Sequence, residues 1–362
     1  MTVTVARPFL RALVPLRTQR FRHLRLQYLI QHRFHQFRQP ILAAQQPRQQ
    51  LLAYANINPS HRFSPSVVDR LATSIYRFEA VATCHPIYSS LRTQSLRARS
   101  GYRLGHGEVK DHLFLDGLED AYDKGRLMGT FAEDCAARYG FTREAQDRFA
   151  IVSLTRAQTA TRDGTFARET VAVQVKSPRG ERMVTQDELP LKADPEKIPN
   201  LKPAFKRDGT VTPANSSAIS DGAAALVLMR MGEAEKRGLK PIAVIKGHAT
   251  HSQEPAWFTT APVGAIQKLY AKVGWSDREV DLYEINEAFA VVTMAAMQTL
   301  KLSHDKVNVH GGACALGHPI GASGARIMVT LLNALEKHGL KRGIAALCIG
   351  GGEATAVAVE RI

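Results

Sequence analysis

From residue 101 onward, the sequence predicts a layered α/β fold. Apolar runs of strand length alternate with segments of helical spacing, and glycine or proline stands at most of the boundaries. All 26 glycines of the 362-residue chain lie at or after Gly101. Folded α/β segments need glycine where φ is positive or where two backbones approach closely. We therefore predict a break in the organisation of the chain at residue 100.

The helices and strands that we expect are bounded by these glycines and prolines. Thr142 caps a helix that runs to about Thr161, after a helix that Gly140 ends. Residues 170–212 are polar and proline-rich, which predicts loops with short strands. Pro262 begins a further helix. We expect strands at 223–229, 242–245, 280–285, 306–309, 343–349 and 354–359, a charged helix ended by Gly238, and helices at 262–274, at 290–300 and from about Ala322.

The net charge of +15 is concentrated in the first 100 residues. They hold 15 arginines, no lysine and two acids, Asp69 and Glu79, which gives +13 and leaves +2 for the rest. Three interpretations stay open: a basic arm for nucleic acid or an anionic membrane, an arginine-rich transit peptide, or a segment that does not naturally continue into residues 101–362, such as the product of a shifted reading frame.

Composition excludes several classes of protein. No apolar run reaches the roughly 18 residues of a membrane span. Four scattered cysteines without a CxxC pair predict neither a disulfide framework nor a zinc site, so we expect no metal. No GxGxxG follows a first strand, which argues against hydride transfer. Cytoplasm is the expected location.

Three short motifs occur at or near the ends of expected strands. Asn286 follows one strand, and alone it is typical of a helix N-cap. His318 lies between Gly317 and Pro319 in a glycine-rich loop, where a ligand can come close. Cys348 ends a strand before three glycines; it is either a small buried side chain or a thiol beside free backbone N–H groups. Together, an amide, an imidazole and a thiol suit acyl transfer at a thioester.

These residues carry a resemblance to the thiolase family, of the acetyl-CoA C-acyltransferase kind, over residues 97–362. The motifs are Asn286-Glu287-Ala288-Phe289, Gly317-His318-Pro319-Ile320-Gly321 and Cys348-Ile349-Gly350-Gly351-Gly352. The resemblance implies a thiolase-like α-β-α-β-α layered fold and Claisen condensation or thiolysis of 3-ketoacyl-CoA. Coenzyme A and its thioesters are then the substrates, with no bound cofactor.

The resemblance also implies roles for single residues. His318 would activate a nucleophilic cysteine, and Cys348 would move the α-proton of acetyl-CoA. Asn286 would fix a water in one oxyanion hole, and the Gly350 amide would contribute to the second. Lys202, Asn215 and Met128 are candidates for binding coenzyme A, and the acyl-chain preference would depend on loop packing near Met128 and Trp257–Thr260.

One expected residue is missing. The family nucleophile stands in Cys-Gly-Ser-Gly, about 50 residues before the stretch matching Gly101, where this chain has Leu51–Asn58 without cysteine or glycine. Cys84 lies too close to Gly101 and lacks flanking glycines, so the nucleophile is unknown. We therefore expect an impaired thiolase. The alternative is a catalytically inert, thiolase-like protein whose basic arm binds nucleic acid or an anionic surface.

Four segments are expected: an anomalous, glycine-free segment at 1–100, a loop domain at 101–212, closing elements of the N-terminal half at 213–241, and a C-terminal domain at 242–362. The N-terminal half would be incomplete or altered, and strands near 217–229 would then lack partners and leave open edges. The resemblance implies a homo-oligomer, either a dimer or a tetramer. Nucleic acid and membrane are not expected as partners of the enzyme.

Overall fold

The computed structural model describes residues 2–4, 79–85, 93–94, 110–111, 113–177 and 180–362. The chain forms two compact units, one of Met1–Val5 with Leu71–Ile362 and the other of Ala6–Arg70. All described residues belong to the first unit. The three interpretations of residues 1–100, and the segment 51–58 where a nucleophile was expected, fall almost entirely outside the described residues.

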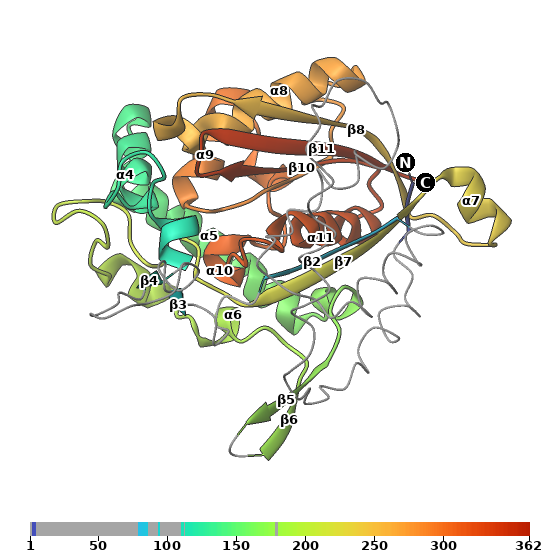
Figure 1. Cartoon of the computed structure of the whole chain (residues 1–362), viewed down its shortest axis with the longest axis horizontal. Coiled ribbons are helices and arrows are strands. Elements are labelled where there is room, and N and C mark those ends of the chain that lie inside the picture. Colours follow the sequence, from blue (N-terminus) through green and yellow to red (C-terminus); the bar gives the residue numbers. More distant parts are fainter. Residues whose placement is uncertain (1, 5–78, 86–92, 95–109, 112, 178–179) are drawn as a thin grey trace, which may run out of the picture. The chain divides into compact units, whose positions relative to one another are not determined.

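A seven-stranded sheet forms the centre of the first unit, in the order β2-β7-β1-β8-β11-β10-β9 (Figure 1). β9 and β10 are parallel, whereas the other neighbouring strands are antiparallel. The expected open edge at β7 is not found, because β1 and β2 pair with it on either side. The strands are β1 (Thr2–Thr4), β2 (Glu79–His85), β7 (Gly222–Met229), β8 (Ala243–Ser252), β9 (Leu282–Ile285), β10 (Arg342–Ile349) and β11 (Glu353–Arg361).

Two long helices cover opposite faces of this sheet (Figure 1). α8 (Ala261–Val273) packs in one core cluster with Tyr283 and Ile344, whereas α11 (Ser323–Lys337) packs in another with Leu282 and Ala345. Since successive strand side chains point to opposite faces, this alternation places a helix layer on each side. The remaining long helices are α4 (Met128–Tyr139), α5 (Arg143–Arg162) and α9 (Ala290–Leu300).

The predicted helix boundaries are confirmed where a cap residue sets them. The Thr142 hydroxyl accepts a hydrogen bond from the Ala145 N–H at 3.2 Å, and α5 begins at the next residue. Gly140 and Gly274 adopt left-handed conformations, with φ of 68° and 70°, directly after α4 and α8. Capping chemistry is local, so it can be predicted without the fold.

One local prediction is wrong. Residues 306–309 form no strand but a 3₁₀ turn, η7 (His304–Lys306), followed by a single bridge between Val307 and Tyr283. The reason is Asn308, whose φ is 49° and whose side chain bonds the backbone of Ile285. The alternative interpretation of Asn286 as an N-cap does not hold, since α9 begins at Ala290, as expected, with Phe289 before it.

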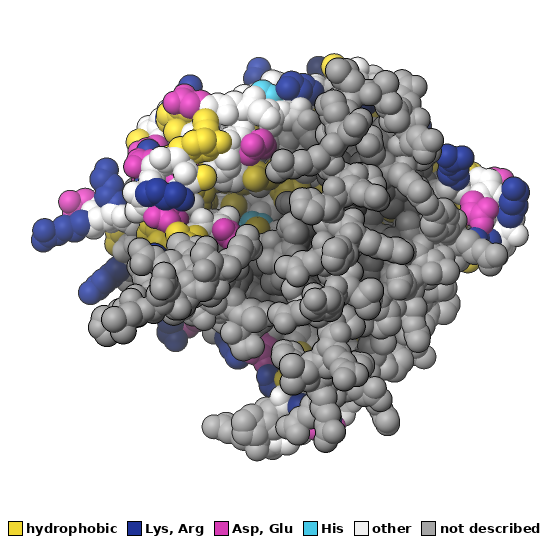
Figure 2. Space-filling view, in the orientation of Figure 1, with side chains coloured by type: hydrophobic (Ala, Val, Ile, Leu, Met, Phe, Trp, Pro, Cys, Tyr) yellow, Lys and Arg dark blue, Asp and Glu magenta, His cyan; other side chains and the backbone are white. Residues whose placement is uncertain are grey.

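Shorter elements lie around these layers, and most of α7 is exposed, with its charged side chains at one margin of the view in Figure 2. In the part of the chain that the structure describes, no helix is long and apolar enough to cross a membrane. The shorter elements are β3 (Thr93–Gln94), β4 (Lys110–Asp111), β5 (Val173–Ser177), β6 (Gly180–Val184), α6 (Leu189–Lys192), α7 (Met231–Lys236), α10 (Ala313–Leu316), the π-helix η3 (Phe114–Leu118) and the 3₁₀ helices η4 (Thr165–Arg168), η5 (Pro195–Asn200) and η6 (Pro255–Thr260).

His310 is buried without a hydrogen bond at either ring nitrogen from the described residues. Its ring packs edge-on against Phe166 and lies 5.5 Å, centroid to centroid, from His338. Burial, with His338 and Lys337 nearby, lowers the pKa of His310 to about 4. In the unfolded chain the imidazole titrates near its ordinary value of 6.5. Unfolding therefore takes up a proton between these two pH values.

We predict that stability falls as pH decreases from about 6.5 to about 4, and that His310→Phe reduces this loss. Between pH 7 and pH 5 the substitution should remove roughly 2 kcal/mol of the acid destabilisation. Urea unfolding at both pH values measures it, with the exposed His248→Phe as control. An identical pH dependence in wild type and His310→Phe would contradict the assignment.

Candidate active site

Asn286 lies at the carboxyl edge of the two parallel strands. β9 is buried along its whole length beside β10, with Ile285 opposite Ala346. The Asn286 N–H continues this ladder by donating to the Ala346 carbonyl at 2.9 Å, and the residue is 1% exposed. This is the edge at which open α/β sheets bind ligands.

The structure brings His318 onto this asparagine. The His318 Nε2 lies 3.3 Å from the Asn286 Nδ2, and its Nδ1 lies 2.5 Å from the Ser323 hydroxyl. That hydroxyl donates its only proton to the Pro319 carbonyl at 3.0 Å, so towards His318 it must act as an acceptor. The contacts therefore assign the proton of a neutral imidazole to Nδ1, and they leave the lone pair of Nε2 facing Asn286.

Backbone contacts fix this loop. The His318 N–H donates to the Ala218 carbonyl at 3.0 Å, and His318 forms a parallel bridge with Ile219. Asn286 Oδ1 is buried and has no hydrogen-bond partner among the described residues. An amide oxygen in this position is an acceptor available to a water or a substrate group.

Glu287 is a residue that sequence reasoning missed, although it stands in the Asn286 motif. Its buried carboxylate accepts hydrogen bonds from Ser153 Oγ at 2.8 Å, Asn308 Nδ2 at 2.8 Å and the Cys314 N–H at 3.0 Å. Burial raises the pKa of Glu287, whereas these hydrogen bonds lower it. A Cβ at Gly312 would lie 2.3 Å from this carboxylate. Through these hydrogen bonds, Glu287 links three separate segments of the chain next to Asn286.

Cys348 lies near the end of β10, opposite Ala354 of β11. Its side chain is buried in the core cluster that also contains Met128 and Cys135, and burial raises its pKa to about 12. Met128 adjoins the following turn, because a Cβ at Gly350 would lie 3.0 Å from its sulfur. Cys348, Gly350 and Met128 therefore lie together at the end of β10. Among the described residues, no hydrogen bond joins Cys348 to Asn286 or His318.

The remaining candidates lie elsewhere. Asn215 is fully buried, and its amide bonds the Thr212 N–H, the Asp147 carboxylate and the Thr210 carbonyl. These contacts favour an internal role over contact with coenzyme A. Lys202 is exposed after η5. Cys84 pairs with Ala223 along β2, and its side chain lies outside the described part.

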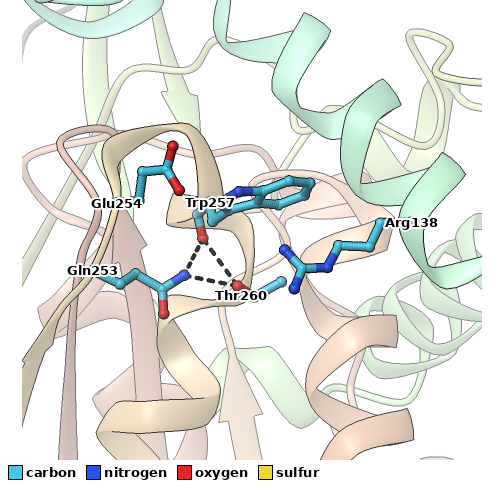
Figure 3. Close-up of a pocket in the computed structure, with 5 residues that line it drawn as sticks. All are labelled: Arg138, Gln253, Glu254, Trp257 and Thr260. Atoms are coloured by element: carbon cyan, nitrogen blue, oxygen red, sulfur yellow. Dashed lines mark hydrogen bonds between the residues drawn. The ribbon is translucent and has the colours of Figure 1, made fainter.

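A separate pocket of about 290 Å³ lies between α4 and η6 and is lined by Arg138, Gln253, Glu254, Trp257 and Thr260 (Figure 3). The Arg138 guanidinium lies 4.3 Å from the centre of the Trp257 ring. The Gln253 amide donates to Thr260 Oγ1 at 2.8 Å. Neither Asn286 nor His318 is among the residues that line this pocket.

Comparisons with known proteins give matches from residue 88 onward. A family model described as the N-terminal domain of thiolase matches residues 88–232, and the model of the C-terminal domain matches residues 239–361. The chain is 48% identical over 267 residues to a probable acetyl-CoA acetyltransferase of Dictyostelium discoideum, covering 74% of this chain and 64% of that protein. It is 46% identical over 266 residues to an acetyl-CoA acetyltransferase of Chromobacterium violaceum, covering 73% and 68%.

Solved structures give the same result. The acetyl-CoA acetyltransferase of Bacillus anthracis aligns with a TM-score of 0.73 and 40% identity, covering 78% of this chain and 72% of that one. The Acat5 thiolase of Ascaris suum, solved in complex with coenzyme A, aligns with a TM-score of 0.71 and 39% identity, covering 82% and 76%. The chain thus spans about two thirds to three quarters of each relative.

We predict that Glu287→Gln destabilises the protein by about 1–3 kcal/mol, because one end of the new amide must present an N–H to a buried donor. Urea unfolding at neutral pH measures the change. The partly exposed Glu279, which also accepts hydrogen bonds, provides the control Glu279→Gln, for which we expect less than about 0.5 kcal/mol. Equal effects of the two substitutions would rule out the bonding role of Glu287.

Proposed function

The chain belongs to the thiolase family, and from this premise we propose that it acts on coenzyme A thioesters by acyl transfer, cleaving acetoacetyl-CoA with coenzyme A or forming it from acetyl-CoA. The observation that carries the proposal is the Asn286–His318 contact at the carboxyl edge of β9 and β10. His318 and Cys348 are proposed as the proton-transfer residues, and Asn286 and Gly350 as oxyanion-stabilising groups.

His318 is suited to accept a proton from a thiol. With its proton on Nδ1, the neutral imidazole presents an unprotonated Nε2 beside Asn286. A base in hydrogen-bond reach of a thiol can convert it to the thiolate, which is the nucleophile. The imidazolium that forms keeps its hydrogen bond to Ser323, and its Nε2–H can then donate to a thioester oxygen.

Cys348 is suited to donate a proton. With a pKa of about 12, the buried side chain is a thiol at neutral pH. In thiolysis without an acyl-enzyme cysteine, the thiol of coenzyme A gives its proton to His318 and adds to the 3-keto carbon. Cleavage of the carbon–carbon bond then leaves the electron pair on the enolate of acetyl-CoA, and the Cys348 proton neutralises that carbon. The proton held by His318 returns to Cys348 through solvent. The protonated Cys348 thus supplies the proton that thiolysis requires.

We propose that the lack of a recognisable nucleophile motif lowers the rate. The sequence holds no cysteine before Cys84, and the Cys-Gly-Ser-Gly motif is absent. Removal of a covalent nucleophile costs roughly several powers of ten in turnover. We therefore propose an impaired acyltransferase whose proton-transfer groups are retained. Lys202 stays a candidate for binding coenzyme A, and a homo-oligomer and a cytoplasmic location stay predictions.

The first test separates carbon–carbon cleavage from proton transfer. We expect cleavage of acetoacetyl-CoA to be several powers of ten slower than in an intact thiolase and to require coenzyme A. We expect exchange of the acetyl-CoA α-protons with deuterated solvent to be measurable by mass spectrometry and to be abolished in Cys348→Ala. The exposed His338→Asn provides a control for His318→Asn, and only the latter should abolish cleavage.

Three outcomes decide between the hypotheses. Cleavage or exchange that depends on His318 or Cys348 supports the proposed enzyme. Absence of cleavage, of exchange and of thioester binding overturns it. Salt-sensitive binding of nucleic acid, together with that absence, would favour the alternative of an inert protein with a basic arm.

A further inference from the structure

Helix α11 packs in an apolar core, but one face of the helix carries a row of polar residues, here called the polar stripe. Ile327, Leu331 and Leu335 of this helix are fully buried in the core under the sheet. The polar residues are spaced by three and four positions, which places them along one face of the helix. They are Ser323, Arg326, Thr330, Asn333 and Lys337.

Four members of the stripe bond groups outside the helix. Ser323 bonds His318 through its hydroxyl. Thr330 and Asn333 donate to the Glu169 carboxylate at 2.9 Å and 2.7 Å, and Asn333 also donates to the Thr165 carbonyl at 3.0 Å. Lys337 donates to the Asp163 carboxylate at 2.8 Å. One end of the stripe therefore holds the candidate catalytic imidazole, and the other end holds the segment that follows α5.

Arg326 is the fifth member and lies one turn after Ser323. Its Nε and Nη2 are buried without a hydrogen-bond partner among the described residues. Its charge nevertheless lowers the pKa of four carboxylates that burial raises: Glu169, Asp187, Glu284 and Glu287. These acids come from three separate segments, and the charge of one guanidinium acts on all of them.

Two of these carboxylates flank Asn286. Glu284 precedes it by two residues and Glu287 follows it directly, and both are at most 1% exposed. The Glu284 Oε1 is buried without a hydrogen-bond partner in the described part of the chain. Arg156 is the other cation that acts on both. Glu284 lies on the same face of β9 as Leu282, which packs in one core cluster with α11, so the Glu284 carboxyl group and the buried Arg326 guanidinium are on elements that face each other.

We propose that Arg326 is a positioning residue for the Asn286–His318 pair. It holds Glu284 and Glu287 on the two sides of Asn286 by its charge, and it stands on the helix whose Ser323 orients His318. Arg326 thereby keeps the Asn286 amide and the His318 imidazole in contact. This proposal rests on the proposed function only in taking that pair as the active site.

The test uses the full-length chain and needs no catalytic activity. Ring-¹⁵N-histidine NMR measures the position of the His318 proton, with His318→Asn assigning the resonances and Ser323→Ala as the variant that changes them directly. Arg326→Met is compared with Arg326→Lys, which restores the charge. The control is Arg168→Met, because Arg168 bonds Glu336 of the same helix at its exposed surface.

We expect Arg326→Met to shift the His318 ring resonances and to lower the melting temperature by several degrees, Arg326→Lys to restore the resonances, and Arg168→Met to leave them in place. Unchanged His318 resonances in Arg326→Met would overturn the proposal. So would a shift that Arg326→Lys does not reverse, because the charge would then not be the cause.

Arg326→Met can also fail to fold. The variant Arg326→Met/Glu284→Gln then decides, because it removes one of the carboxylates that the arginine neutralises. Recovery of a folded protein supports the shared-charge role, and no recovery overturns it. A shift of His318 in a protein without acetoacetyl-CoA cleavage would support Arg326 as a positioning residue while the proposed function fails.

Discussion

The candidate site depends on one buried carboxylate. Glu287 accepts hydrogen bonds from α5, from the Asn308 side chain and from the backbone at Cys314, so it holds together three segments that lie far apart in the sequence. Asn286 precedes it directly, and the His318 loop follows Cys314 by four residues. The geometry of the reacting groups is therefore set by a residue that has no proposed part in the chemistry. Desolvation makes this arrangement costly unless every hydrogen bond is made.

A similar dependence on neighbouring residues applies to the two proposed proton-transfer groups. His318 derives its tautomer from Ser323, whose hydroxyl is in turn committed to a backbone carbonyl. Cys348 derives its protonated state from burial beside an apolar cluster. Hydrogen bonds keep Nε2 of His318 unprotonated, and the apolar surroundings of Cys348 keep its thiol protonated. A loop side chain and a side chain at the end of a strand are thus suited to opposite proton-transfer roles.

The sequence predicts much of this fold because its signals are local. Thr142, Gly140 and Gly274 set helix boundaries through their own backbone preferences and caps, and the apolar runs locate β7, β9, β10 and β11 to within about two residues. The strand expected at 306–309 does not form, because the Asn308 side chain bonds the Ile285 backbone in place of a ladder of backbone hydrogen bonds. Glu287 and the polar residues Thr330, Asn333 and Lys337 of α11 escape sequence reasoning, since their partners are 21 to 174 residues away along the chain.

Gly312 shows how such a site constrains positions that have no chemistry of their own. Its φ of −135° is open to any residue, so conformational freedom is not what requires a glycine there. The space that a methyl group would fill is already occupied by the Glu287 carboxylate. Even alanine would have to displace a charged group from the only partners that justify its burial. Natural variation at this position is thus limited by the volume of a neighbour, in a loop where sequence drift is otherwise common.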